Sequence, residues 1–246
     1  MAMSPLRLLT PANHGDAAWI FTSTYGGGLV GGDAISIRVK VGGGACAFVS
    51  TQASTKVYRS SRGADVELQA DIAKNGTLVV VPDPVVCFAA SQYRQEQRID
   101  IADGGGVVLV DWLSSGRRAA GERWAFDEYV SRTSVRYGGR LVVYDSLALR
   151  AADGDLAIRM GRFDVLALVV MVGGVIRSEA GWVAEQVNAR PIVRQPDDLV
   201  AATTLGEIGC VVRIAGRSVE QVGRRLRQLL GFVPRLLGDD PWSRKW

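Results

Sequence analysis

The sequence predicts a mainly β protein built of stacked β-layers, with a helical part near the C-terminus. Two observations carry this prediction: a strand–turn–strand unit recurs three times, and the clear helix signals fall in the last third of the chain. The 246 residues can bury a sizeable core, and no stretch has the composition of a linker. We therefore expect a single domain over residues 1–246, with β-layers at about 20–176 and the helical part at about 177–246.

The recurring unit is an alternating strand, a glycine-containing turn and a nearly continuous apolar strand. Its copies read ISIRVKV-GGG-ACAFVS, VELQADI-AKNG-TLVVVP and EQRIDI-ADGG-GVVLVDW. The equivalent glycines Gly44, Gly76 and Gly106 lie 32 and 30 residues apart. The alternation of apolar and polar residues predicts one solvent-exposed face for each first strand, whereas each apolar second strand should be buried on both faces. The regular spacing indicates units that bury their faces on one another.

Two further β elements follow the repeat. The pair Gly138-Gly139 separates two runs with apolar periodicity, at 128–137 and 140–149, and predicts a hairpin. The run VLALVVMVGGVI at 165–176 predicts a buried strand and a Gly-Gly turn. It is shorter than the roughly 20 residues that span a bilayer, so we expect no membrane segment.

The helix signals lie near the end of the chain. Ser218 with Gln221 three residues on forms a capping-box pattern, and apolar residues then recur on one helical face. This helix should end before Pro234. A second, weaker helix is expected somewhere between residues 179 and 202.

Composition limits the function classes. The net charge of +4 is spread along the chain, which argues against nucleic-acid binding, because nucleic-acid-binding proteins concentrate their basic residues on one face. Cys46, Cys87 and Cys210 form neither a CxxC motif nor a disulfide framework, and the N-terminus has no signal-peptide pattern. A cytoplasmic location fits best.

The stretch YGGGLVGGD at residues 25–33 raises a choice between a phosphate cradle and a tight turn. Gly26 and Gly31 have Walker A spacing, but Gly32 and Asp33 stand where Lys and Ser or Thr are needed. A Rossmann loop also fits poorly, since no strong strand is expected before the stretch and a strand follows it. We interpret the stretch as a tight turn. The alternative, a nucleotide-dependent or hydrolytic enzyme that uses the Gly26–Asp33 loop, stays open, although the single histidine, His14, gives nucleophilic catalysis little support.

Polar motifs interrupt the apolar strands at three places. STQASTKVYRS follows one strand, PDPVVCF places Asp83 between two prolines, and DWLSSGRRAAGERW combines Asp111 with Glu122 and several arginines. Such charges usually pair with one another or with the backbone. The other interpretation is a polar interface or a hydrophilic passage, and spacing does not separate the two.

These blocks resemble, in order and spacing, the family of the urease accessory protein UreD, also called UreH. The resemblance runs through GGGLVGGD, STQASTKVYRS, PDPVVCF with SQYRQ, and LVDWLSSGR with AGERW, and continues in GGRLVVYDSLAL and PRLLGDDPW. The motifs DPVVCF and LVDWLSSGR are most similar to the plant-type branch.

The resemblance implies a mainly β, layered or helicoid structure with two helices near the C-terminus. It also implies a chaperone without enzyme activity, a metallochaperone scaffold that binds UreF, and through it the GTPase UreG, and docks on apo-urease. The hetero-oligomer would assist nickel insertion into the urease active site. No cofactor would be permanently bound, and Ni²⁺ would pass in transit through an internal water-filled passage.

Four carboxylates are candidates for transient nickel contacts. By resemblance, Asp33 and Glu122 match acidic positions of the family pattern and come first, and Asp83 and Asp111 follow. Carboxylates suit transit, because soft thiolates would hold the ion more tightly. On this hypothesis, replacing Asp33 and Glu122 together by alanine would lower urease activation and leave the UreF complex intact.

Overall fold

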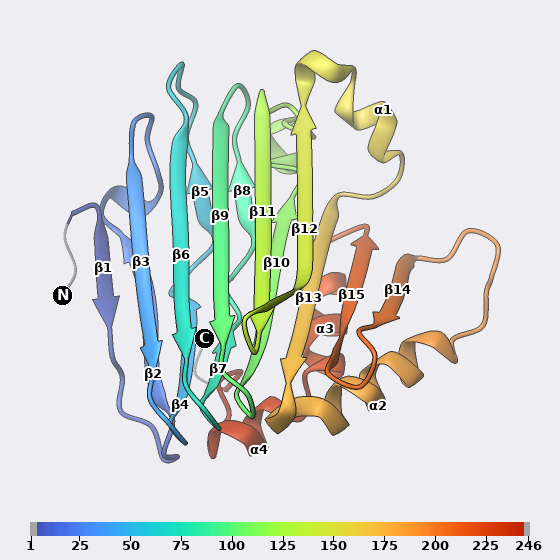
Figure 1. The fold of residues 1–246 in the computed structure, drawn as a ribbon. Helices are drawn as coiled ribbons and strands as arrows, with labels where there is room; N and C mark the ends of the chain where they lie inside the picture. Colours follow the sequence, from blue (N-terminus) through green and yellow to red (C-terminus); the bar gives the residue numbers. More distant parts are fainter. Residues whose placement is uncertain (1–3, 244–246) are drawn as a thin grey trace.

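The computed structural model describes residues 4–243 and confirms a mainly β protein in which two sheets face each other (Figure 1). The ends of the predicted domain, residues 1–3 and 244–246, lie outside the described residues. The smaller sheet has the order β12 (Arg140–Arg150), β11 (Glu128–Tyr137), β9 (Gln92–Ile101), β6 (Ala64–Ile72) and β3 (Ala34–Val41). The larger sheet has the order β1 (Leu6–Leu9), β2 (Ala18–Thr24), β4 (Cys46–Thr51), β7 (Thr77–Val80), β10 (Gly106–Ser114), β13 (Val165–Gly173), β15 (Gly209–Gly216) and β14 (Asp198–Thr204), with β5 (Thr55–Val57) and β8 (Val85–Cys87) joined at its side.

The three predicted strand–turn–strand units are confirmed as β3–β4, β6–β7 and β9–β10. The first strands of the units pair in parallel in the smaller sheet, and the second strands pair in parallel in the larger sheet. Each glycine turn therefore carries the chain from one sheet to the other, so that successive units stack as turns of a coil. The Gly138-Gly139 hairpin is also confirmed, as the antiparallel pair β11–β12.

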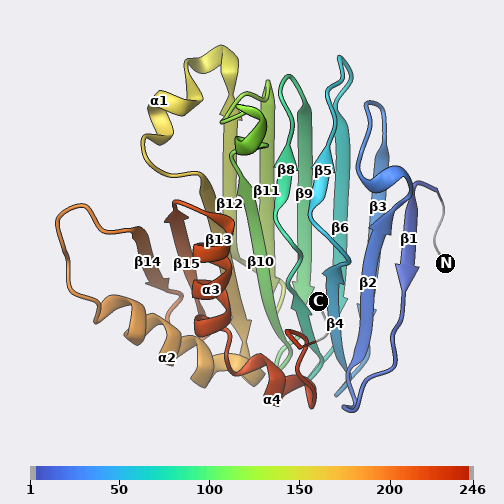
Figure 2. The ribbon, with the colours of Figure 1, turned by 180° about the vertical axis from the view of Figure 1, so that it is seen from behind.

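Apolar side chains form a core on each face of the larger sheet. Between the sheets, residues such as Leu68 and Ile99 meet Leu78 and Leu109. The other face packs against the helices, which lie together in front of the larger sheet in the rear view of Figure 2. These helices are α2 (Arg177–Asn188), α3 (Val219–Leu229) and α4 (Val233–Leu237). Two cores explain why β7 and β10 are apolar on both faces.

The helical part predicted at 177–246 also contains two strands, β14 and β15, which extend the larger sheet. The helix expected after Ser218 is confirmed, since the Ser218 Oγ accepts a hydrogen bond from the Gln221 N–H. This helix, α3, ends at Leu229, before Pro234, as predicted, and a second short helix, α4, begins at Val233. Proline is tolerated in a first turn, where its missing N–H has no intrahelical partner.

Several short elements were not predicted from the sequence. Strands β1 and β2 precede the glycine stretch, so the expectation of no strong strand there was wrong. The short helix α1 (Leu156–Met160) follows β12 and is capped by Asp155. Short 3-10 helices occur at Tyr25–Gly27, Arg118–Ala120, Ala151–Asp153 and Gly174–Ile176. Among residues 4–243, no helix combines the length and the apolar character needed to cross a membrane.

Candidate functional site

A cavity of about 120 Å³ lies between the two sheets. Its wall is largely apolar, but polar side chains from both sheets reach it, among them Thr51, Asp83, Gln95 and Asp111. Since a water molecule occupies about 30 Å³ in the liquid, the cavity has room for roughly four waters. Two of the four predicted acidic residues, Asp83 and Asp111, thus border one internal space.

Asp111 is the centre of a hydrogen-bonded network in this space. β10 points Asp111 toward the smaller sheet, where Ser131 Oγ donates to Oδ2 at 2.5 Å and Tyr129 Oη donates to Oδ1 at 3.3 Å. Gln95 donates to Ser131 at 2.9 Å, and Tyr93 donates to Gln95 at the same distance. Asp111 comes from β10 of the larger sheet and its partners come from β9 and β11 of the smaller sheet, so the network joins the two sheets.

Burial raises the pKa of Asp111 above its ordinary value, although hydrogen bonds from Ser131, Gln95 and Tyr129 to the carboxylate act in the opposite direction. The pKa values of Tyr93 and Tyr129 are raised by the same burial and by the negative charge of Asp111. The charged form of each of these groups is therefore less favoured here than in water.

Asp83 stands on the same cavity but is held differently. Its backbone N–H donates to Thr51 Oγ1 at 2.7 Å, and the Thr51 hydroxyl lies 3.3 Å from Asp83 Oδ2. Next to it, the indole N–H of Trp112 donates to the Pro82 carbonyl at 2.8 Å. The two prolines and these hydrogen bonds fix the segment that carries Asp83 between β7 and β8.

Asp111 also borders a second space, a groove of about 600 Å³. The groove lies beside the outer edge of β12 and is lined there by Asp145, whose carboxylate pairs with Arg213 of β15. Polar side chains thus form a layer between the sheets, from Asp83 through Gln95 and Asp111 to Asp145. Within this layer Asp111 is common to the cavity and the groove.

Asp33, one of the two first candidates, closes a turn. Its carboxylate accepts a hydrogen bond from the Val30 N–H at 2.8 Å, and its own N–H donates to the Val30 carbonyl at 3.1 Å. Asp33 does not border the cavity between the sheets. The position of Asp33 therefore matches the interpretation of the glycine stretch as a tight turn.

Glu122, the other first candidate, is paired with Arg117 and accepts a hydrogen bond from the Ala89 N–H. The Arg117 guanidinium lies 4.1 Å from the centre of the Phe88 ring. The hydrogen bonds from Arg117 and Ala89 lower the pKa of Glu122. Glu122 does not border the cavity either, so it joins two loops as an ion-paired carboxylate.

The glycine stretch is a close-packed turn, as predicted. Gly26, Gly27 and Gly32 have positive φ angles, and a Cβ at Gly31 would lie 1.7 Å from Ser60 Oγ. The Leu29 N–H donates to the Lys56 carbonyl, and the Gly32 N–H donates to the Gly63 carbonyl. The loop therefore uses these N–H groups to bind a neighbouring segment of the chain, whereas a phosphate cradle would need them free.

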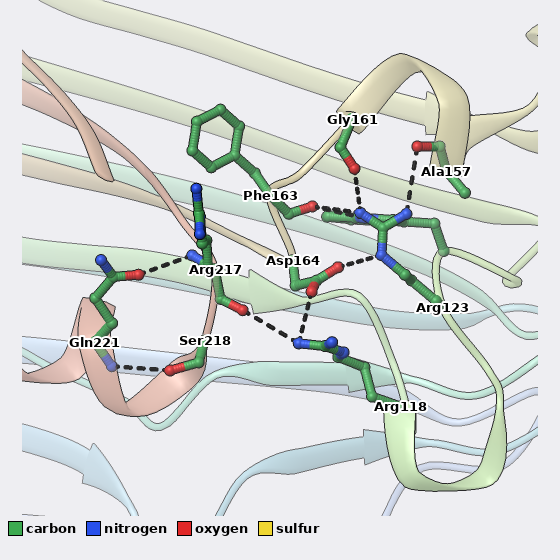
Figure 3. A network of polar contacts seen from close by, with 10 residues as sticks. Arg118, Arg123, Ala157, Gly161, Phe163, Asp164, Arg217, Ser218 and Gln221 are labelled. Carbon is green, nitrogen blue, oxygen red and sulfur yellow. Dashed lines mark hydrogen bonds and ion pairs between the residues drawn. The ribbon is translucent and has the colours of Figure 1, made fainter. Parts of the chain in front are cut away.

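The sequence interpretation missed Asp164, a buried carboxylate that organises the AGERW segment (Figure 3). Arg123 and Arg118 both pair with it, and Arg123 also donates to the carbonyls of Ala157, Gly161 and Phe163. Arg118 additionally reaches the Arg217 carbonyl just before α3. The network ties the loop after β10 to the turn after α1. Its signal in the sequence was the excess of arginine over acid in SGRRAAGERW.

No group of three or more His, Cys, Asp or Glu side chains among residues 4–243 has a geometry that holds a metal ion. The cysteines are also poor ligands at neutral pH. Burial raises the pKa of Cys87 to about 12 and that of Cys210 to about 11, and it raises the pKa of Cys46 as well. The thiolate is the form that binds metal, so these protonated thiols are weak ligands. The metal donors that remain in the interior are carboxylate and neutral oxygen atoms.

Comparison with known proteins identifies the family. The sequence model of the UreD urease accessory protein family matches residues 2–246. The chain belongs to this family. The urease accessory protein UreD of Sorangium cellulosum (strain So ce56) is 52% identical over 248 aligned positions, which cover 100% of this chain and 78% of that protein. The urease accessory protein D of Arabidopsis thaliana is 33% identical over 270 positions, covering 97% and 92% of the two chains. The predicted resemblance is therefore confirmed, and with it a part in urease maturation.

Proposed function

We propose that this UreD family member is a scaffold without enzyme activity that joins UreF and UreG to apo-urease and passes nickel ions along the polar layer between its sheets. Nickel is the cargo, and no permanently bound cofactor is required. The observation that supports the passage is that Asp83 and Asp111 border one internal cavity, while Asp111 also borders the groove beside β12.

The chemistry of the layer suits transit. Divalent nickel binds carboxylate and water oxygen less tightly than it binds thiolate or imidazole, so oxygen donors favour rapid exchange. Asp111 supplies one carboxylate, and Ser131, Gln95 and Tyr129 hold it in place. A cation near Asp111 would favour its ionised form and so oppose the rise in the pKa of this carboxyl group that burial causes.

The scaffold role is supported by family membership and by the surface. Large apolar side chains are exposed at several places, including Tyr25 and Val30 on the glycine loop, Trp182 on α2 and Ile192 after it. Exposed apolar surface is typical of proteins that act in complexes. We place the hetero-oligomer in the cytoplasm, which fits three cysteines that are all free thiols.

The nucleotide-dependent or hydrolytic alternative has less support, because the N–H groups of Leu29, Val30 and Gly32 in the glycine loop form hydrogen bonds within the chain. Calorimetry of the purified protein with GTP and ATP would test it, and binding of either nucleotide would favour this alternative. A nucleic-acid role would require binding that weakens steeply with salt.

Urease activation in cells that also express the urease subunits, UreF and UreG tests the proposal. Asp111→Asn and Asp83→Asn should lower urease activity and the nickel content of purified urease, while each variant still co-elutes with UreF. Asp33→Asn and Glu122→Gln serve as matched controls, since these acids lie away from the cavity.

The possible outcomes of this experiment distinguish the nickel passage from the scaffold role. Normal nickel loading with both cavity variants would refute the passage. Failure of the wild-type chain to co-elute with UreF would refute the scaffold. A loss of activation confined to Asp33→Asn and Glu122→Gln would restore the sequence-based choice of residues.

A further inference from the structure

The smaller sheet ends in an open edge at β12. Within the described residues, β12 pairs with β11 on one side and with no strand on the other. The strand is 11 residues long, so its free side presents a long row of backbone N–H and C=O groups. An edge of this kind is a template on which another strand can add.

The larger sheet continues past this edge. In Figure 1, β15 and β14 extend beyond β12, and no strand of the smaller sheet lies in front of them. α2 packs on their other face. The uncovered face carries Leu199 and Ala201, which are exposed, and together with Leu147 and Leu168 they line the groove of about 600 Å³. A strand added to β12 would cover this apolar surface with every second side chain.

The charges on the strands at this edge favour one kind of occupant. Of their arginines, Arg213 lines the groove itself, whereas Arg132 and Arg150 line a separate groove. β11, β12 and β15 carry five arginines and two carboxylates. One of these carboxylates, Glu128, is already shared between Arg150 and Arg94. The other, Asp145, is paired with Arg213. Positive charge therefore remains at this edge and favours a negatively charged partner.

A second copy of the chain fits less well than an acidic strand. If β12 paired along its whole length with β12 of another copy in antiparallel fashion, Arg140 would lie opposite Arg150 at both ends. Like charges directly opposite each other destabilise a strand pair. Carboxylates at those positions would instead be attracted.

We infer that the free edge of β12, together with the uncovered face of β14 and β15, binds an extended acidic segment of a partner protein as a sixth strand of the smaller sheet. Backbone hydrogen bonds to β12 supply the affinity, and apolar side chains at alternate positions fill the groove. The inference is independent of nickel transit, because it requires neither a metal nor urease.

Labelled peptides test this inference with the full-length protein. One peptide matches the 11 residues of β12 in length and alternates valine with glutamate, and a second has lysine in place of glutamate. Fluorescence anisotropy should show roughly tenfold tighter binding of the acidic peptide at low salt. Hydrogen exchange should slow at β12 amides when the peptide is bound.

Ala201→Trp fills the groove from an exposed position and should weaken binding of the acidic peptide by about tenfold. Ser36→Trp, at an exposed position on β3 at the opposite edge of the same sheet, is the matched control and should bind like the wild type. Circular dichroism checks that both variants fold. Equal binding of the two peptides, protection outside β12, or a dimer whose β12 amides are already protected would overturn the inference.

Discussion

The Asp164 network allows a stability prediction in which solvent exposure, more than distance, decides the magnitude. Asp164 is nearly buried, with 7% of its side chain exposed, and it pairs with both Arg123 and Arg118. The two arginines differ, since 30% of the Arg123 side chain is exposed and 60% of the Arg118 side chain is. The perturbations are Asp164→Asn, Arg123→Ala and Arg118→Ala.

The expected free energies follow from this difference. A charge-assisted hydrogen bond contributes about 1.5–3 kcal/mol when it is shielded, whereas an exposed ion pair contributes about 0–1 kcal/mol. Asp164→Asn keeps one oxygen, and Arg123 keeps its three carbonyl acceptors. We therefore expect a loss of about 2 kcal/mol for Asp164→Asn, a similar or larger loss for Arg123→Ala, and less than about 1 kcal/mol for Arg118→Ala.

Urea unfolding followed by circular dichroism measures these values, and thermal unfolding checks them. For a protein of this size, about 2 kcal/mol corresponds to a fall of roughly 4–8 °C in Tm. The double variant Asp164→Asn with Arg118→Ala should lose little more than Asp164→Asn alone, because both remove the same pair. If Arg118→Ala destabilises as much as Arg123→Ala, the argument from exposure is wrong.

Three other predictions concern stability. Burial raises the pKa of Asp198, but hydrogen bonds from Arg190 and Arg225 outweigh it, so the pKa lies below 3.8 and the carboxylate stabilises the fold above that pH. Asp198→Asn should therefore lower the free energy of unfolding by about 2 kcal/mol at pH 7. Urea titrations should show this difference disappear as pH falls through the lowered pKa. Asp111 has the opposite sign: its pKa in the folded protein is raised above 3.8, so the wild type loses stability as pH rises from 3.8 through the raised pKa, and Asp111→Asn should gain in Tm relative to the wild type over that range. Gly31→Ala should destabilise by roughly 1–3 kcal/mol in thermal unfolding, because its Cβ would overlap the neighbouring segment, and should fail to express if the loop is rigid.

The repeat was predictable because two local signals coincide in each unit. Alternating apolar and polar residues in β3, β6 and β9 indicate that each strand has one solvent-exposed face, and the glycine turns determine where each strand ends. The partner of each strand was not predictable from these signals. The two strands of a unit look like a hairpin in sequence, yet they enter different sheets and pair in parallel with the next unit. Only the stacking of the units decides this.

The late strands β14 and β15 were missed for a related reason. β15 is apolar enough to be read as a strand, but β14 is short, exposed and rich in alanine and threonine. Its pairing with β15 supplies the backbone hydrogen bonds, and α2 covers one of its faces. A strand stabilised by its neighbours in this way has little signal of its own.

For the candidate site, sequence reasoning found the right residue types and ranked them by a pattern of motifs. Asp33 and Glu122 came first because they match acidic positions of the family pattern. Asp33 also closes the glycine motif, and the end of a turn is a place where a carboxylate is common for structural reasons. Asp111 carries a stronger physical signal: it is a carboxylate inside the otherwise apolar strand GVVLVDWLS. A charge there is unfavourable unless it is hydrogen-bonded or pairs with a cation.

The polar layer around Asp111 divides the space between the sheets. Apolar side chains toward the glycine turns form one core and those toward α1 form another, and Gln95, Gln97, Ser131 and Thr133 lie with Asp111 between them. An apolar layer of the same shape would stabilise the fold at least as well, because burying a carboxyl group raises its pKa and opposes its charge. Stability therefore does not account for this layer. The proposed passage for a hydrated cation predicts that Asp111→Asn raises the stability of the protein at neutral pH and lowers urease activation.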